Sequence, residues 1–292
     1  MSTEQIKREL DAAKKHYELD FLEDCEKKLI SNSKKFTKDY RLEKVELPAL
    51  TVANVAKVEA MIRADSKYAP SDEYDNSEYL PYWMRELGRH LGCIKGDKRI
   101  KDFGEVVKNV VQKLNKENST FLNFDKNKDT NRTAVDEMIK RINGFENDQK
   151  KLVDLLRDRT SGELITLLSN PTELKSKDKG RHISFASKFC HYACFYIFEG
   201  KDGQDNFSIC DSVVAKVLPY YLEYWKIKDV DQKKLKFKDK NFEEYREYCK
   251  AIDKIIKKSK SKISRNGFDH LLWYYFKDKD KKRSKKPRKE VR

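Results

Sequence analysis

Apolar residues recur every three or four positions along most of the chain, which is the spacing of one face of an α-helix. The first such stretch runs from Ile6 to Leu29 and follows a Ser2–Gln5 capping-box signature. Two weakly alternating stretches, 45–52 and 235–238, do not amount to a sheet. The pattern predicts an all-α fold, with further helices at 51–64, from Pro81 onward, and over 103–114, 133–143, 147–157, 161–168, 182–198, 212–225, 241–262 and 266–276.

These elements predict a compact multi-helix body with a tail. We divide the body into an N-terminal helical part, 1–145, and a second part, 146–276, that shares its core with the first. Residues 277–292 form a basic tail that we expect to be disordered. Hydrophobic residues make up 38% of the chain and aromatic residues 11%, which is enough for a core. No apolar run approaches the roughly 20 residues that cross a bilayer, so a membrane-spanning protein is excluded.

The net charge of +15 is concentrated at one end. Residues 226–292 contain 25 basic and 11 acidic side chains, whereas the first 225 residues contain 39 and 38. A basic segment releases counterions when it meets a polyanion, so nucleic acid is the favoured partner. The alternative is a solvated tail that only aids solubility. An anionic membrane surface is disfavoured because the tail lacks apolar residues to insert.

The six cysteines and the polar start of the chain predict a cytoplasmic protein with free thiols. Three of the cysteines, Cys190, Cys194 and Cys210, lie near His191 in the sequence. Their spacing matches no zinc or iron–sulfur pattern, so burial explains them better than a metal. We expect neither a metal nor a cofactor.

A polar loop has the alternating oxygen ligands of an EF-hand, at Asp125, Asn127, Asp129 and Asn131. The sixth position is Thr130, where the motif requires glycine for a tight turn. The twelfth is Asp136, where the motif has a bidentate glutamate. Both departures favour an ordinary polar loop over a calcium site.

The segment 183–218 is the part of the chain that carries candidate chemistry. It is predicted to form a helix, a turn and a second helix. Lys188 lies among apolar residues near the start of the first helix, and desolvation of its ammonium group would favour a nucleophilic amine. Asp211 opens the second helix, where the helix dipole would keep it ionised. The alternatives are an N-cap role for Asp211 or Ser212, and a Lys188 whose amine extends into water.

This segment resembles the helix–hairpin–helix signature of DNA base-excision glycosylases, nearest to the 8-oxoguanine glycosylase fold and to a divergent bacterial branch with that fold. Ser184-Phe185-Ala186-Ser187-Lys188 stands where the family has Gly-x-Gly-x-Lys. Phe207-Ser208-Ile209-Cys210-Asp211-Ser212-Val213 stands where it has a hydrophobic-Pro-hydrophobic-Asp-x-hydrophobic run. The 23 residues from Lys188 to Asp211 slightly exceed the usual separation, and the extra length falls in the turn at 199–206.

The resemblance implies a mechanism and a set of contacts. Lys188 would attack C1′ of a flipped nucleotide, and Asp211 would stabilise the cationic sugar or orient the attacking group. We expect the base pocket to draw on Phe185, His191, Cys210, Trp273 and Tyr274. We expect the DNA backbone to meet Ser184, Ser187, Lys281, Lys282, Arg283, Lys285 and Lys286. A satisfied core histidine is the alternative for His191, and core packing at a helix end is the alternative for the aromatic run 273–276.

The expected function is that of a monomeric DNA glycosylase, with or without lyase activity, acting on double-stranded DNA in repair or in anti-phage defence. In a bacterium it would be associated with the nucleoid. Ser184 and Ala186 replace the two hairpin glycines that let the backbone approach a phosphate, so the basic C-terminal region would have to compensate. The alternatives are a non-enzymatic nucleic-acid-binding protein on the same scaffold, and a helical protein whose tail docks to acidic partners.

Overall fold

The computed structural model of the protein describes residues 47–64, 75–117, 122, 133–160, 162–169, 182–239 and 241–276. Within these ranges the chain forms ten α-helices and a short 3-10 helix, and no β-strand, which confirms the all-α prediction there. The helices are α3 (Val52–Ala64), α4 (Leu80–His90), α5 (Phe103–Glu117), α6 (Ala134–Asn143), α7 (Gln149–Arg157), α8 (Glu163–Ser169), α9 (Ile183–Ile197), α10 (Ser212–Tyr224), η1 (Lys234–Lys236), α11 (Phe242–Ser259) and α12 (Arg265–Phe276). The predicted helix at 6–29, the polar loop at 125–131 and the tail at 277–292 lie outside these ranges.

Local sequence signals explain where several helices begin. Pro81 lies in the first turn of α4, where its missing N–H leaves no hydrogen bond unmade. A capping box opens α6, because Thr133 accepts from the Asp136 amide and the Asp136 carboxylate accepts from the Thr133 amide. The carboxylate that a calcium loop would need is therefore used to start a helix.

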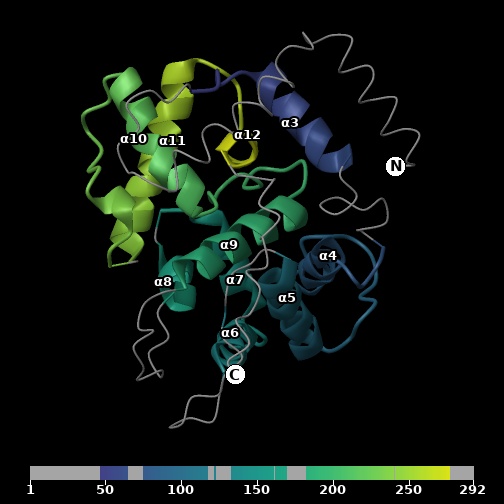
Figure 1. The fold of residues 1–292 in the computed structure, drawn as a ribbon. Helices are drawn as coiled ribbons and strands as arrows, with labels where there is room; N and C mark the ends of the chain where they lie inside the picture. Colours follow the sequence, from purple (N-terminus) through teal and green to yellow (C-terminus); the bar gives the residue numbers. More distant parts are fainter. Residues whose placement is uncertain are drawn as a thin grey trace, which may run out of the picture.

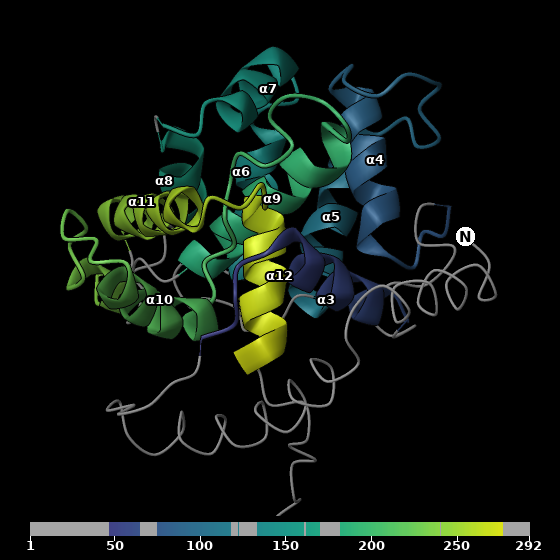
Figure 2. The same ribbon diagram turned by 90° about the horizontal axis from the view of Figure 1, so that it is seen from above.

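The helices pack in two groups (Figure 1). The first group is α4 to α9, with α9 packed against α4, α5, α7 and α8. The second consists of α3, α10, α11 and α12, and α12 packs against the other three. Figure 2 shows α12 lying between α3 on one side and α10 and α11 on the other. The boundary predicted at residue 145 falls between α6 and α7, inside the first group.

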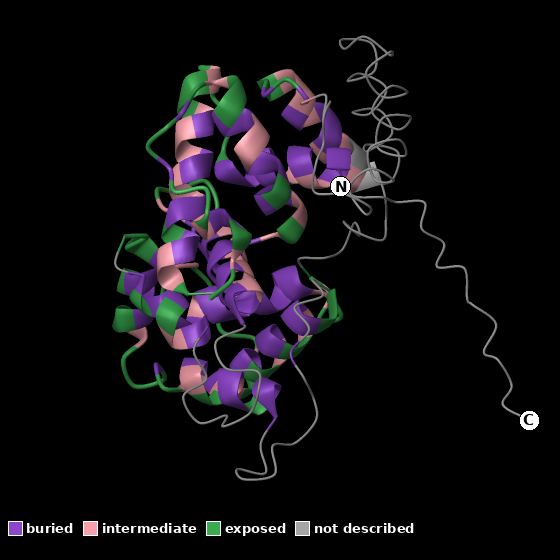
Figure 3. Ribbon diagram, turned by 60° about the vertical axis from the view of Figure 1, so that its left-hand side comes forward, coloured by how far each residue is buried: buried purple, intermediate pink, exposed green. Residues whose placement is uncertain are grey.

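One connected set of buried side chains spans both groups, and the buried faces of the helices point inward (Figure 3). Three of the buried tyrosines in this core each donate a hydrogen bond to a backbone carbonyl. Tyr221 reaches Pro48 at 2.6 Å, across 173 positions of sequence. Tyr245 and Tyr248 reach the segment before α10 at 2.8 and 2.7 Å. Among the described helices, none combines the length and apolar character that a bilayer crossing requires.

Candidate active site around Lys188

Lys188 lies at the edge of the core, in the second turn of α9. Its neighbours Phe185, Ala186, Ser187 and Phe189 are fully buried, whereas Lys188 itself is half-buried. Ser184 and Tyr192, one turn before and one turn after it, are also half-buried. Burial lowers the pKa of the Lys188 amine from its usual value, which raises the fraction present as the neutral nucleophile.

Asp211 is the N-cap of α10. Its Oδ1 accepts hydrogen bonds from the amides of Val213 and Val214, at 2.7 and 3.4 Å. The capping interpretation made from the sequence is therefore correct for Asp211. Capping does not exclude chemistry, because the side chain remains half-exposed and its second carboxylate oxygen is not used by these two bonds.

A buried extended segment, 207–210, carries the chain to Asp211 and is tied to its surroundings at every residue. The carbonyls of Phe207, Ser208 and Ile209 accept hydrogen bonds from His191, Tyr245 and Tyr248 respectively. The Cys210 amide donates to the Ser187 hydroxyl at 3.0 Å. These four bonds fix the segment against α9 on one side and α11 on the other.

The bond between Ser187 and Cys210 joins the residues directly adjacent to Lys188 and Asp211. The two candidate catalytic residues, 23 positions apart in the sequence, are therefore brought together. Their electrostatic coupling agrees, since the Asp211 carboxylate raises the pKa of Lys188 against the effect of burial. The hydrogen bond and the electrostatic interaction place the two residues near each other, and whether their side chains share one cleft stays a prediction.

Sequence reasoning missed two residues that interact electrostatically with the Lys188–Asp211 pair, Asp269 and Tyr192. Asp269 lies on α12, is 5% exposed, and its charge also raises the pKa of Lys188. Burial raises the pKa of the Tyr192 hydroxyl, and the carboxylates of Asp269, Glu117 and Asp211 add to that rise. The available signals were an acidic residue inside the apolar run of α12 and a tyrosine one helical turn after Lys188.

His191 is the satisfied core histidine that the sequence offered as an alternative. It is 1% exposed, its Nδ1 lies 2.8 Å from the Phe207 carbonyl and its Nε2 lies 3.0 Å from the Asn266 side chain. Burial lowers the pKa of its imidazole, so the ring is neutral at pH 7. His191 is buried in the core, where its hydrogen bond to Asn266 links α9 to α12.

The other predicted pocket residues divide by burial. Phe185 is 0% exposed and stacks on Phe189 with ring centroids 6.3 Å apart, inside the core. Cys210 and Tyr274 are buried as well. Trp273 is half-buried and lies one turn after Asp269 on the same face of α12, which makes it the predicted aromatic residue best placed near the site.

Of the residues predicted to meet the DNA backbone, the two serines are described in the structure and the five basic residues are not. Ser184 and Ser187 are inside α9, which already begins at Ile183. The Ser187 hydroxyl is fully buried, accepting from Cys210 and donating to the Ser184 carbonyl at 3.2 Å, so it serves an internal contact. Lys281, Lys282, Arg283, Lys285 and Lys286 lie outside the described ranges.

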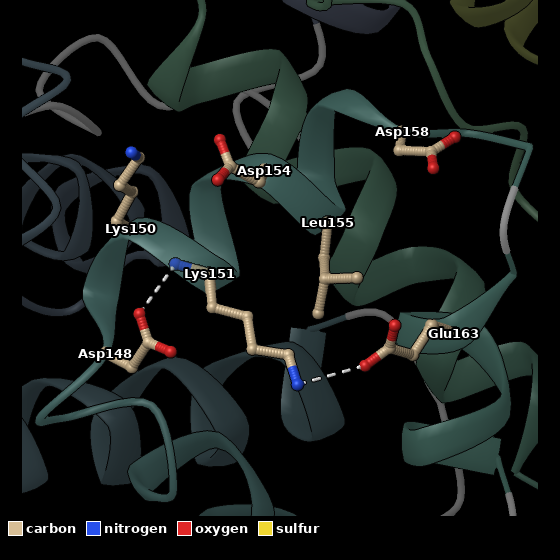
Figure 4. A pocket seen from close by; sticks show the side chains of 7 residues that line it. All are labelled: Asp148, Lys150, Lys151, Asp154, Leu155, Asp158 and Glu163. Atoms are coloured by element: carbon tan, nitrogen blue, oxygen red, sulfur yellow. Dashed lines mark hydrogen bonds and ion pairs between the residues drawn. The ribbon is translucent and has the colours of Figure 1, made fainter.

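A separate hollow of about 450 Å³ opens between α7 and α8 (Figure 4). Two of its acidic side chains make local contacts: Asp148 caps α7, and Glu163 pairs with Lys151 at 3.2 Å. None of its lining residues belongs to the Lys188 site. In the described part of the chain, no three His, Cys, Asp or Glu side chains are arranged to hold a metal ion.

The site therefore combines a lysine amine whose pKa is lowered by burial with two carboxylates and a tyrosine, contributed by α9, α10 and α12. Such a set suits covalent attack on an electrophilic carbon beside a developing positive charge. Comparison of the chain with protein-family models, with curated proteins and with solved structures finds no match.

Proposed function

We propose that the protein is a DNA glycosylase that uses Lys188 and Asp211 to remove a damaged or modified base from a flipped nucleotide. The observation that carries the proposal is the hydrogen bond from Cys210 to Ser187, which holds a half-buried lysine beside an aspartate at a helix N-terminus. The motif resemblance requires this pairing of a lysine and an aspartate far apart in sequence.

In the proposed reaction, the neutral Lys188 amine attacks C1′ and the glycosidic C–N bond breaks. The bonding electrons leave with the base, which takes up a proton. The Asp211 carboxylate stabilises the positive charge that develops on the sugar. The C1′–O4′ bond then breaks, its electrons go to O4′, which takes a proton from water, and a protonated Schiff base between Lys188 and C1′ remains. Loss of a C2′ proton with expulsion of the 3′ phosphate would add lyase activity.

The proposal also includes a glycosylase-like helical scaffold that acts on duplex DNA as a monomer. It places the protein in the cytoplasm or nucleoid, with a role in repair or anti-phage defence. The charge excess after residue 225 supports a polyanionic partner.

Borohydride trapping tests the proposal. The protein is mixed with duplexes carrying oxidised, deaminated or alkylated bases, and the reduced covalent adduct is measured. We expect an adduct with the native chain and with Lys150→Ala, an exposed-lysine control, and none with Lys188→Ala. Asp211→Asn should stop base release while leaving the fold intact, because asparagine is an equally good N-cap.

The outcomes separate the alternatives. Base release without an adduct would leave a hydrolytic enzyme that depends on Asp211. No adduct and no base release over the whole panel would refute the proposal and favour a non-enzymatic nucleic-acid-binding protein.

A further inference from the structure

The C-terminal ends of α10 and α11 lie side by side. After α10, the chain turns back along α11: Asp229 pairs with Lys254, and the Asp231 amide donates to Glu247 at 3.0 Å. The later residue of the first segment contacts the earlier residue of α11, so the two segments are antiparallel. Residues 224–228 therefore lie toward the C-terminal end of α11, which is the upper end of this group in Figure 1.

Exposed lysines gather where these two ends meet. Lys254 forms an ion pair with Asp229, but four further lysines are exposed and form no ion pair with any described residue. The acidic residue next to them is Glu223. We call the following set the α10–α11 surface: Tyr224, Lys226, Lys228, Lys257 and Lys258.

Helix stability alone does not account for these lysines. A cation in the last turn of a helix gains about 0.3–1 kcal/mol from the helix dipole, which is a reason for Lys257 and Lys258. Lys226 has φ +53, in the left-handed region where a side chain costs about 1–2 kcal/mol and glycine is preferred. A lysine at that position lowers the stability of the fold relative to glycine.

Tyr224 supplies an aromatic group to the same surface. It is 71% exposed, and Val52 is the one other large hydrophobic residue exposed among those described. Its ring lies edge-on to Trp225 at 5.5 Å, and Trp225 stacks on the buried Tyr221 at 5.3 Å. The exposed ring is thus braced by the core, with its hydroxyl available as a donor.

We propose that the α10–α11 surface binds the phosphate backbone of duplex DNA whose flipped nucleotide occupies the Lys188 site. The proposal rests on the proposed glycosylase function. Lysine and tyrosine are both common phosphate-contacting residues. Because α10 begins at Asp211 and extends about 20 Å to Tyr224, the contacted phosphates lie roughly six nucleotides from the flipped one.

The main experiment measures the affinity for duplex DNA against salt concentration. In the test variant, glutamine replaces Lys226, Lys228, Lys257 and Lys258. The matched control makes the same replacement at four exposed lysines on the other helix group, Lys95, Lys98, Lys101 and Lys108. We expect the test variant to lower the slope of log affinity against log salt by about three to four. Between 50 and 200 mM salt, the native chain would then lose on the order of 100-fold more affinity than the variant.

Two further measurements locate the contact. When the duplex has fewer than about six base pairs on one side of the lesion, the native and test proteins should show the same slope of log affinity against log salt. Tyr224→Phe should weaken binding at constant salt slope, because it removes a donor but no charge. The proposal would be overturned if the native and test proteins had equal salt slopes, or if the control variant lowered the salt slope as much as the test variant does. Binding to poly-glutamate that depends on these lysines, with DNA binding unchanged, would also overturn it by identifying an acidic protein partner.

The outcome is separable from that of the proposed function. At low salt and saturating DNA, the test variant should form the borohydride adduct as well as the native chain, because Lys188 and Asp211 are untouched. Loss of the adduct at saturation would contradict a role limited to the phosphate backbone. If neither the native chain nor the test variant forms an adduct but their salt slopes still differ, the α10–α11 surface binds DNA and the glycosylase proposal is wrong.

Discussion

Replacing Ser187 with alanine removes the contact that holds Lys188 beside Asp211. The Ser187 hydroxyl is fully buried and accepts from the Cys210 amide at 3.0 Å. Without it, the buried amide loses its partner, which costs about 1–3 kcal/mol of unfolding free energy. We expect a loss of about 2 kcal/mol, which lowers the folded-to-unfolded ratio roughly 30-fold and the melting temperature by about 4–8 °C.

Urea and thermal unfolding, followed by circular dichroism, measure this loss. Ser212→Ala is the matched control, because Ser212 is exposed at the first position of α10 and should change the free energy by no more than about 0.5 kcal/mol. At equal folded concentration, Ser187→Ala should also form the borohydride adduct more slowly than the control. If the two variants unfold alike, the reasoning that this bond fixes the site is refuted.

Three other changes test the environment of the site and its support. Asp269→Asn should lower the pKa of Lys188 further, because the Asp269 carboxylate raises that pKa in the native protein; NMR titration of lysine 13Cε signals measures it. Burial holds the pKa of His191 below its unfolded value of about 6.5, so the free energy of unfolding should fall as the pH drops below about 6.5, by up to 1.4 kcal/mol per pH unit. Gly162→Ala should cost more than about 2 kcal/mol in a denaturation assay, because φ is +63 there and a Cβ atom would overlap the Phe242 ring.

Each of these has its own control. The Lys188→Ala spectrum identifies the lysine signal, and an unchanged or raised pKa in Asp269→Asn would contradict the electrostatic description. His191→Gln should remove the extra acid sensitivity, and equal slopes with pH would show that His191 is not its source. Gly92→Ala should cost only about 1 kcal/mol, because φ is +67 but no atom lies within 4 Å. An equal loss at both glycines would exclude the steric explanation.

The helices could be predicted from the sequence because each has its own apolar residues at helical spacing, and α6, α7, α10 and α11 also begin with a side-chain N-cap. Pro81 and Asp211 each opened a predicted helix and do so in the structure. The packing of α3 against α12 could not be predicted, since a stripe shows which face is buried and not what covers it.

The same distinction applies to the site. Lys188 and Asp211 lie on the predicted elements, because an isolated lysine in an apolar helix and an aspartate at a helix start are both visible locally. Asp269 was missed because its role depends on how α12 docks beside α9, and the two residues are 81 positions apart. Tyr192 was missed because a tyrosine in an apolar helix cannot be told from a core position by sequence alone.

The packing of α3 against α12 has a consequence for how the chain is made. Helices α4 to α9 are contiguous in sequence and can assemble while translation continues. The second group cannot close until α12 has left the ribosome, more than 200 residues after α3. At 5–20 residues per second, the apolar face of α3 waits about 10 to 40 s for its cover. In the nascent chain, α3 therefore remains without its packing partner during this interval, even after Lys188 on α9 has been synthesised.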